Sequence, residues 1–139
     1  MKIFFDTSAL IKRYLFENGS KKVDTLFEEC DEVYISEITE IEINSALKRR
    51  LVEKDIENSS YNYILNEFYE DLKDFNIIDL SFYLKKRSIE LIRKNQLKTL
   101  DSLQLGAALL SPVDIFVTAD KKLYNIARLE FNNKSLYIE

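Results

Sequence analysis

Four acidic residues stand beside apolar or small residues in four separate parts of the chain. Asp6 ends the apolar run in "KIFFD", and Asp120 follows the run "IFVT" after one alanine. Asp101 precedes the apolar segment "SLQLGAALL", and Glu42 lies within "SEITEIEINSALKRR". The chain contains no histidine, which excludes Ser-His and Cys-His nucleophile pairs and most zinc chemistry. Any catalysis must therefore use carboxylates, lysine, tyrosine or a metal bound by oxygen ligands.

Carboxylates that converge on one crevice repel one another unless a proton or a cation lies among them. A hard divalent cation relieves this repulsion, and sites made only of oxygen ligands select Mg²⁺ or Mn²⁺ over zinc or copper. Such a metal lowers the pKa of a bound water, positions that water for in-line attack and neutralises charge developing on a phosphate. If the four acids meet, the sequence predicts a metal site suited to phosphodiester hydrolysis.

Asp6 and Asp101 also have a purely structural interpretation. Asp6 taken alone is an ordinary acid at the end of a strand. Asp101 shares a helical stripe with Leu105 and Ala108, so a carboxylate begins an otherwise apolar face. An acid in a first helical turn also interacts favourably with the helix dipole, or caps the helix. The two interpretations of Asp101 have about equal weight from the sequence.

The segment around residue 42 offers more than one glutamate. Periodicity does not choose between Glu40 and Glu42, because apolar residues flank more than one side of the predicted helix. Glu42 is favoured by its small neighbours Ser45 and Ala46, which are typical of an inward-pointing face. Against this, Thr39 and Glu42 fit a capping box, in which the glutamate has only a structural use.

Short apolar segments alternate with longer segments of helical spacing. The first kind predicts strands over 2–5, 33–36, 76–80 and 115–118, with 135–138 as a candidate fifth strand. The second kind predicts helices over 20–30, 37–54, 59–75, 81–96, 100–110 and 120–131. Parallel strands need helical crossovers, so we expect an α/β fold whose mainly parallel sheet of four to five strands is covered on both faces. Ligands bind beyond the carboxyl ends of such strands, where Asp6 and Asp120 would share a crevice if their strands are neighbours.

The composition is that of an ordered globular protein. With 139 residues, 46% of them hydrophobic, two glycines and one proline, we expect a single domain over 1–139. The lone Cys30 cannot form an internal disulfide and is expected to be a buried small hydrophobic residue. No cleavage-like segment is present and no run approaches the ~18 apolar residues of a membrane span, so a cytoplasmic location without membrane contact is expected. The net charge of −4 argues against binding nucleic acid through bulk positive charge.

The four segments that contain the acids together resemble the PIN-domain family, most closely the VapC-type toxin ribonucleases of toxin–antitoxin pairs. The resemblance covers essentially the whole chain and is carried by "DTSALIKRYLFENGS", "SEITEIEINSALKRR", "LKTLDSLQLGAALL" and "FVTADKKLYNIAR". The family's acidic quartet falls on Asp6, Glu42, Asp101 and Asp120. Glu42 is chosen over Glu40 because the family's glutamate precedes a small triplet by three residues, as Glu42 precedes the triplet at 45–47.

The resemblance implies a three-layer α/β/α sandwich, Mg²⁺- or Mn²⁺-dependent endoribonuclease activity and products with a 5′-phosphate. It also implies frequent homodimers and inhibition by a small antitoxin that partly occupies the active-site groove. In this scheme the three aspartates hold one or two metal ions, and Glu42 completes the site or helps to deprotonate the attacking water. The hydroxyls of Thr7, Ser8 and Thr118 could orient carboxylates or water, although local caps and turns explain them equally well. Gly106 departs from the alanine common in similar proteins, and a glycine there would allow close packing.

An RNA substrate requires basic side chains around an acidic pocket. The candidates near the motifs are Lys12, Arg13, Lys48, Arg49 and Lys98, although an ordinary surface charge is the more frequent role of each. Tyr14 could stack on a base or belong to the core.

Other functions compete with the ribonuclease hypothesis. A PIN-like module could bind RNA or protein without catalysis, or a PIN nuclease could act outside a toxin–antitoxin pair. Haloacid-dehalogenase-type phosphatases need a second aspartate where this chain has Ser8, and receiver domains need acid pairs that this chain lacks. Both of these classes are set aside.

Overall fold

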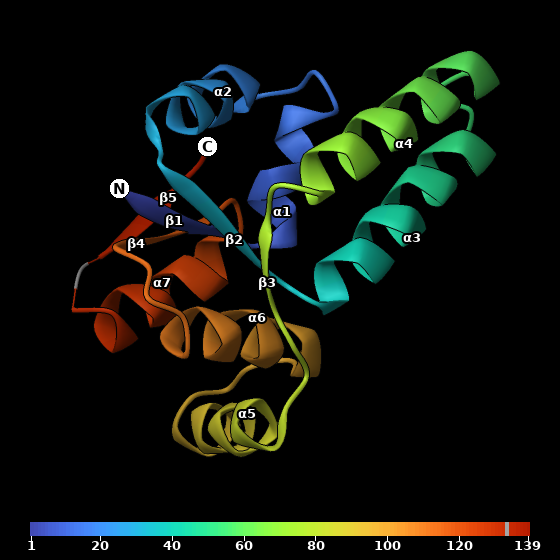
Figure 1. The fold of residues 1–139 in the computed structure, drawn as a ribbon. Coiled ribbons are helices and arrows are strands. Elements are labelled where there is room, and N and C mark those ends of the chain that lie inside the picture. The colour runs from blue at the N-terminus through green and yellow to red at the C-terminus, as the bar shows by residue number, and fades with distance from the viewer. Residues whose placement is uncertain (133) are drawn as a thin grey trace.

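A five-stranded parallel sheet forms the centre of the computed structural model, which describes residues 1–132 and 134–139 (Figure 1). The strand order is β3-β2-β1-β4-β5, and every neighbouring pair is parallel. The strands are β1 (Lys2–Phe5), β2 (Glu32–Ser36), β3 (Asn76–Ile78), β4 (Ile115–Thr118) and β5 (Ser135–Tyr137). The predicted parallel sheet is confirmed, and the candidate fifth strand is part of it.

Helices join the strands and cover the sheet. They are α1 (Thr7–Leu10) with the 3₁₀ turn Ile11–Arg13, α2 (Ser20–Glu29), α3 (Ile38–Val52), α4 (Asn58–Leu72), α5 (Phe82–Lys94), α6 (Thr99–Leu109) and α7 (Lys121–Glu130). The six predicted helices are confirmed to within a few residues at their ends. The short helix α1, which turns the chain directly after β1, was not predicted, because four residues are too few to show a helical period.

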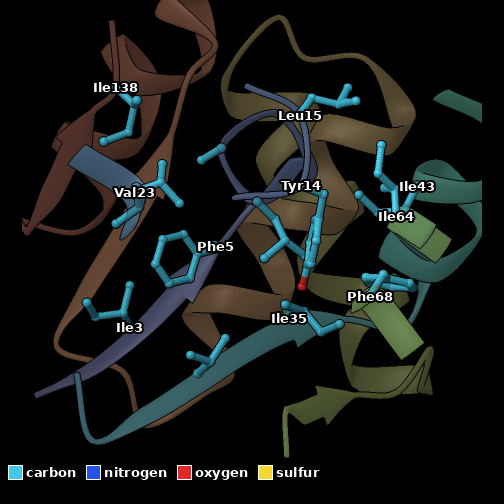
Figure 2. Close-up of a cluster of buried hydrophobic side chains, with 14 of the residues drawn as sticks. Ile3, Phe5, Tyr14, Leu15, Val23, Ile35, Ile43, Ile64, Phe68 and Ile138 are labelled. Atoms are coloured by element: carbon cyan, nitrogen blue, oxygen red, sulfur yellow. The ribbon is translucent and has the colours of Figure 1, made fainter. Parts of the chain in front are cut away.

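Alternation along the strands builds a core on each side of the sheet. Ile3 and Phe5 face a cluster with residues of α1 to α4, part of which is drawn in Figure 2. Phe4 and Phe116 face a second cluster with residues of α5, α6 and α7. Each fully buried large apolar side chain contributes about 1.5–3 kcal/mol to stability. The three-layer α/β/α arrangement implied by the family resemblance is confirmed.

The register of β1 and β4 determines where the first and last acids lie. Phe5 stands opposite Val117, so the chain leaves both strands at the same edge of the sheet. The Asp6 amide donates a hydrogen bond to the Val117 carbonyl at 3.0 Å, which extends the pairing by one residue. Asp6 and Asp120 were expected to share a crevice if their strands are neighbours. β1 and β4 are neighbours, so this condition is met.

Gly106 lies where α6 packs against α5. A Cβ atom at this position would lie 3.0 Å from Leu84 Cδ1 and 3.1 Å from Ser88 Oγ, closer than side chains ordinarily approach. The expectation that this glycine allows close packing is confirmed.

Two smaller features concern the rest of the chain. Cys30 is half-buried against the first core, so the expectation of full burial was too strong. Within the ranges that the structure describes, none of the helices is long and apolar enough to cross a bilayer.

Replacing Gly19 by alanine should destabilise the protein. Gly19 has φ of +92°, and an added Cβ would lie 2.6 Å from Ile138 Cγ2 and 2.8 Å from the Glu139 carbonyl oxygen. Left-handed strain of about 1–2 kcal/mol and overpacking of about 1–3 kcal/mol should lower the free energy of unfolding by about 2–5 kcal/mol in urea titrations. The control is Lys21→Ala, an exposed change in α2, the helix that Gly19 precedes. Its free energy of unfolding should stay within about 0.5 kcal/mol of the wild type. Equal midpoints for the wild type and Gly19→Ala would contradict the prediction.

Candidate active site

Asp6 is buried at the carboxyl end of β1, with 3% of its surface exposed. Its carboxylate accepts hydrogen bonds from Ser8 Oγ at 2.7 Å, Thr118 Oγ1 at 2.9 Å and the Ala9 amide at 3.2 Å. Burial, with a smaller effect from the charge of Asp101, raises the pKa of Asp6 from 3.8 to about 7 against the lowering effect of the three hydrogen bonds. The side chain is thus firmly oriented, but its charged form lacks a compensating positive charge.

Asp120 begins α7 at the carboxyl end of β4. Its Oδ1 accepts a hydrogen bond from the Leu123 amide at 3.0 Å, and its own amide donates to Thr118 Oγ1 at 3.0 Å. The Ser8 hydroxyl accepts a hydrogen bond from the Ala119 amide at 3.0 Å. Ser8 and Thr118 therefore join the ends of β1 and β4 through the same hydroxyls that orient Asp6.

Asp101 lies in the first turn of α6 and links the other acids electrostatically. Desolvation raises the pKa of its half-buried carboxyl, and the charges of Asp120 and Glu42 raise it further. The same carboxyl contributes to the raised pKa of Asp6. No side chain caps α6, since its N-cap residue is Lys98. Asp101 therefore does not cap α6, although its place in the first turn agrees with the favourable helix-dipole interaction, and it also interacts electrostatically with the three other acids.

Glu42 projects from α3 toward these aspartates. Its Oε1 accepts hydrogen bonds from Thr7 Oγ1 and Gln104 Nε2, both at 2.7 Å. The capping box considered for Thr39 and Glu42 is wrong, because α3 already begins at Ile38 and Glu42 bonds to side chains of other elements.

Glu40 occupies a different surface. Its side chain is exposed and accepts a hydrogen bond from Tyr69 of α4 at 3.0 Å. Of the two glutamates that periodicity left open, the structure therefore brings Glu42, and not Glu40, beside the aspartates.

The four acids are linked through Asp101 by their electrostatic effects, but they are more widely spread than a compact coordination shell. Among residues 1–132 and 134–139, no three Asp, Glu, Cys or His side chains are close enough to hold one metal ion as they stand. Each of Asp6, Glu42 and Asp120 is held by its own hydrogen bonds, and like charges repel. An all-oxygen donor set of this kind fits Mg²⁺, which retains several waters and binds through one or two carboxylates. The residues present therefore fit a hydrated divalent cation.

A groove of about 640 Å³ opens beside Glu42. Polar side chains of Thr7, Ser8 and Glu42 line one part, and Arg49 and Arg50 line another. Its apolar lining comes from Ile11, Ile38, Ile41, Ala46 and Leu100. The groove can therefore accept a chain that carries both negative charge and apolar groups.

Only some of the basic residues considered for RNA contact lie near the acids. Arg49 lines the groove, and the Lys98 charge acts on Asp101. Lys12 instead pairs with Glu17 at 3.2 Å, and Lys48 is an exposed residue of α3. Arg50 of the run "KRR" also lines the groove, but like Lys12 it pairs with Glu17, at 3.1 Å.

Arg13 and Tyr14 do not belong to the site. The Arg13 guanidinium donates to Asp71 at 2.9 Å and lies 4.2 Å from the ring centre of Phe27. Tyr14 is buried and donates its hydroxyl proton to Asp71 at 2.8 Å. The RNA contacts considered for these two residues are therefore wrong, because both side chains are bonded to Asp71 of α4.

Two further residues escaped the sequence reasoning. The charge of Lys122 lowers the pKa of the Asp101 carboxyl. The position of Lys122, two residues after Asp120 in the chain, could have suggested this role. Gln104 bonds to Glu42, and its signal was a single amide within the apolar run "SLQLGAALL".

Comparisons with known proteins agree with the fold. The family model of the PIN domain matches residues 3–129. A toxin–antitoxin complex from Klebsiella pneumoniae is similar with a TM-score of 0.67 and 24% identity, over 88% of this chain and 89% of that chain. FitAcB from Neisseria gonorrhoeae has a TM-score of 0.69 at 18% identity, with 90% and 92% covered. VapBC2 from Rickettsia felis, bound to a DNA fragment from its promoter, has a TM-score of 0.69 at 16% identity, with both chains fully covered (100% each). No curated protein matches the chain.

Proposed function

This chain belongs to the PIN domain family, and from that premise we propose that it is a Mg²⁺- or Mn²⁺-dependent endoribonuclease of the VapC toxin type. The observation that carries the proposal is the position of Asp101, whose carboxyl feels the charges of Asp120 and Glu42 and itself acts on the carboxyl of Asp6. Carboxylates are placed within electrostatic reach of one another, partly out of water, at the edge of the sheet where ligands bind. Such an arrangement destabilises the metal-free protein and is therefore typical of a functional site.

Asp6, Asp101 and Asp120 would hold one or two metal ions, directly or through water, and Glu42 would complete the site. When bound, the metal would supply an acidified water and positive charge beside the scissile phosphate. Ser8 and Thr118 keep the Asp6 carboxylate oriented through bonds of 2.7 and 2.9 Å. None of the described residues donates a hydrogen bond to Glu42 Oε2, so this oxygen can accept the proton of the attacking water. Attack by water would leave a 5′-phosphate on one product.

Basic residues around the acids would guide the RNA backbone. Arg49 lines the groove beside Glu42, and the charges of Lys98 and Lys122 reach Asp101. Phosphates attracted by these three cations would pass over the acidic crevice. The overall charge of −4 then suits a local path better than a uniformly basic surface.

The proposal includes an antitoxin partner, a homodimer and a cytoplasmic location. Similar structures include a Klebsiella pneumoniae toxin–antitoxin complex and VapBC2 from Rickettsia felis, which support an antitoxin for this chain. The apolar part of the groove, with Ile38, Ile41 and Leu100, would accept apolar side chains of that antitoxin while its acidic or polar groups meet Arg49. An antitoxin segment in this position would block access to Glu42.

Cleavage of structured RNA by the purified, antitoxin-free protein tests the proposal. We expect cleavage with Mg²⁺ or Mn²⁺, none with a chelator, and a loss of about 10²–10³-fold or more in Asp101→Asn, since that change removes charge stabilisation worth several kcal/mol. Asp79→Asn is the matched control, because Asp79 is exposed after β3 at the same edge of the sheet. Absence of cleavage by the wild type with either metal, or undiminished cleavage by Asp101→Asn, would refute the mechanism. RNA binding without cleavage would instead favour the non-catalytic binding module.

A further inference from the structure

Gln104 is a polar side chain in the interior, with 3% of its surface exposed. It lies on α6 one turn after Asp101 and faces α1 and α3. Its Nε2 lies 2.7 Å from Glu42 Oε1, 2.9 Å from Thr7 Oγ1 and 3.0 Å from Thr39 Oγ1. One amide nitrogen therefore joins three elements around Glu42.

The chemistry of its partners determines which end of the amide faces them. An ionised Glu42 carboxylate can only accept hydrogen bonds. The Thr7 hydroxyl donates its proton to Glu42 Oε1 and is left as an acceptor toward Gln104. A reversed amide would bring two oxygens within 2.7 Å of each other without a proton between them. The nitrogen must therefore point toward Glu42.

The other end of the amide is not satisfied. Gln104 Oε1 is buried and has no hydrogen-bond partner among the described residues. A buried carbonyl oxygen without a partner is destabilising, and an apolar side chain of the same shape would avoid this penalty. Stability alone therefore does not account for a glutamine at this position.

We propose that Gln104 is a positioning residue that holds the Glu42 carboxylate by Oε1 and leaves Oε2 free toward the aspartates. This inference rests on the proposed function, because it assigns Gln104 its role through the carboxylate that would complete the metal site. Together, Thr7 and Gln104 donate two hydrogen bonds to one oxygen of Glu42 and restrict its rotation. Groups that orient the ligands of a metal in this way typically affect metal affinity or activity by about 10–100-fold.

The test is Gln104→Met, which keeps the length of the side chain and removes its donor. We expect the dissociation constant for Mn²⁺, measured without RNA from the electron paramagnetic resonance signal of the free ion, to rise by about 10–100-fold. The turnover number for RNA should fall over the same range, while KM for RNA stays within about twofold, because Gln104 is buried away from the backbone path. The melting temperature of the metal-free variant should equal or exceed that of the wild type.

A further variant separates positioning from a general disturbance of α6. Ser88→Ala removes a buried hydroxyl that donates to the Ser102 carbonyl of α6 at 3.2 Å, and it does not contact Glu42. This variant should keep the wild-type Mn²⁺ affinity.

Equal Mn²⁺ affinity and equal turnover in the wild type and Gln104→Met would overturn the inference, while RNA cleavage by both would uphold the proposed function. An equal loss of Mn²⁺ affinity in Ser88→Ala would also overturn it, because the effect would then belong to the packing of α6. A wild type that binds Mn²⁺ without cleaving RNA would overturn the proposed function alone, and the comparison of Mn²⁺ affinities would still decide the role of Gln104.

Discussion

The Asp6→Asn variant is expected to lose RNA cleavage and yet to be more stable than the wild type at pH 8 without metal. Activity should fall by about 10²–10³-fold or more, because a preorganised group that stabilises charge in the transition state is removed. The neutral amide retains the shape of the carboxyl and can still accept from the Ala9 amide and Ser8 Oγ. An acid with a purely structural role should show the opposite pattern, with lower stability and unchanged activity.

The sign of the stability change follows from the pKa of Asp6. Burial raises it from 3.8 to about 7, so the folded protein holds a proton that the unfolded chain releases between these values. The contribution of Asp6 to stability is therefore fully present below about pH 4 and is lost as the pH rises through about 7. A difference of about three pKa units corresponds to about 4 kcal/mol. Asparagine avoids this penalty but loses charge-assisted hydrogen bonds, so the expected gain at pH 8 is about 1–3 kcal/mol.

Thermal melts in a chelator at pH 5 and pH 8 measure this effect. Asp6→Asn should melt about 3–10 °C above the wild type at pH 8, and the difference should shrink toward pH 5. Asp79→Asn, an exposed acid after β3, should leave both the melting temperature and cleavage unchanged. A variant that melts below the wild type at pH 8 and still cleaves RNA would show that Asp6 is only a cap of α1.

The second large effect is expected at Glu42. Glu42→Gln should reduce cleavage by about 10²–10⁴-fold, since it removes a carboxylate proposed to accept a proton from the attacking water. Its amide can still accept from Thr7 Oγ1, so the free energy of unfolding should change by less than about 1 kcal/mol.

Glu40→Gln is the matched control for this prediction. Glu40 is only two residues away on the same helix, but it is exposed and bonded to Tyr69. Its cleavage rate should stay within about threefold of the wild type, as expected for a surface change away from the reacting groups. Initial rates on one labelled RNA at saturating Mg²⁺ would compare the two variants. If Glu40→Gln lost most of its cleavage activity while Glu42→Gln kept full activity, Glu40 and not Glu42 would have the proposed role.

Much of the fold was visible in local patterns. Strand segments such as "KIFF" and "IFVT" and the six longer helices are each determined by hydrophobic period and length, which neighbouring residues supply. Boundaries were less certain, and β3 pairs only over Asn76–Ile78, although the apolar pattern continues to residue 80. Pairing with a neighbouring strand, which the segment itself does not contain, decided where β3 ends.

The acids at strand ends were also predictable. Asp6 and Asp120 follow apolar strands, and parallel strands direct their carboxyl ends to one edge of a sheet. Hydrophobic alternation and helical crossovers therefore predicted one carboxylate at the end of each of two strands, while the sheet order decided that these strands are neighbours.

Tertiary contacts decided which remaining side chains reach that crevice. Tyr14 and Arg13 stand in the first motif, but Asp71, which lies 57 and 58 residues further along the chain, binds both. Glu42 and Gln104 are separated by 62 residues and meet because α3 and α6 both begin near the carboxyl edge of the sheet. Local residue patterns determine strands, helices and the acids that end them, because those depend on neighbours in the chain. Which polar groups become partners depends on packing between distant elements, and no local period contains that information.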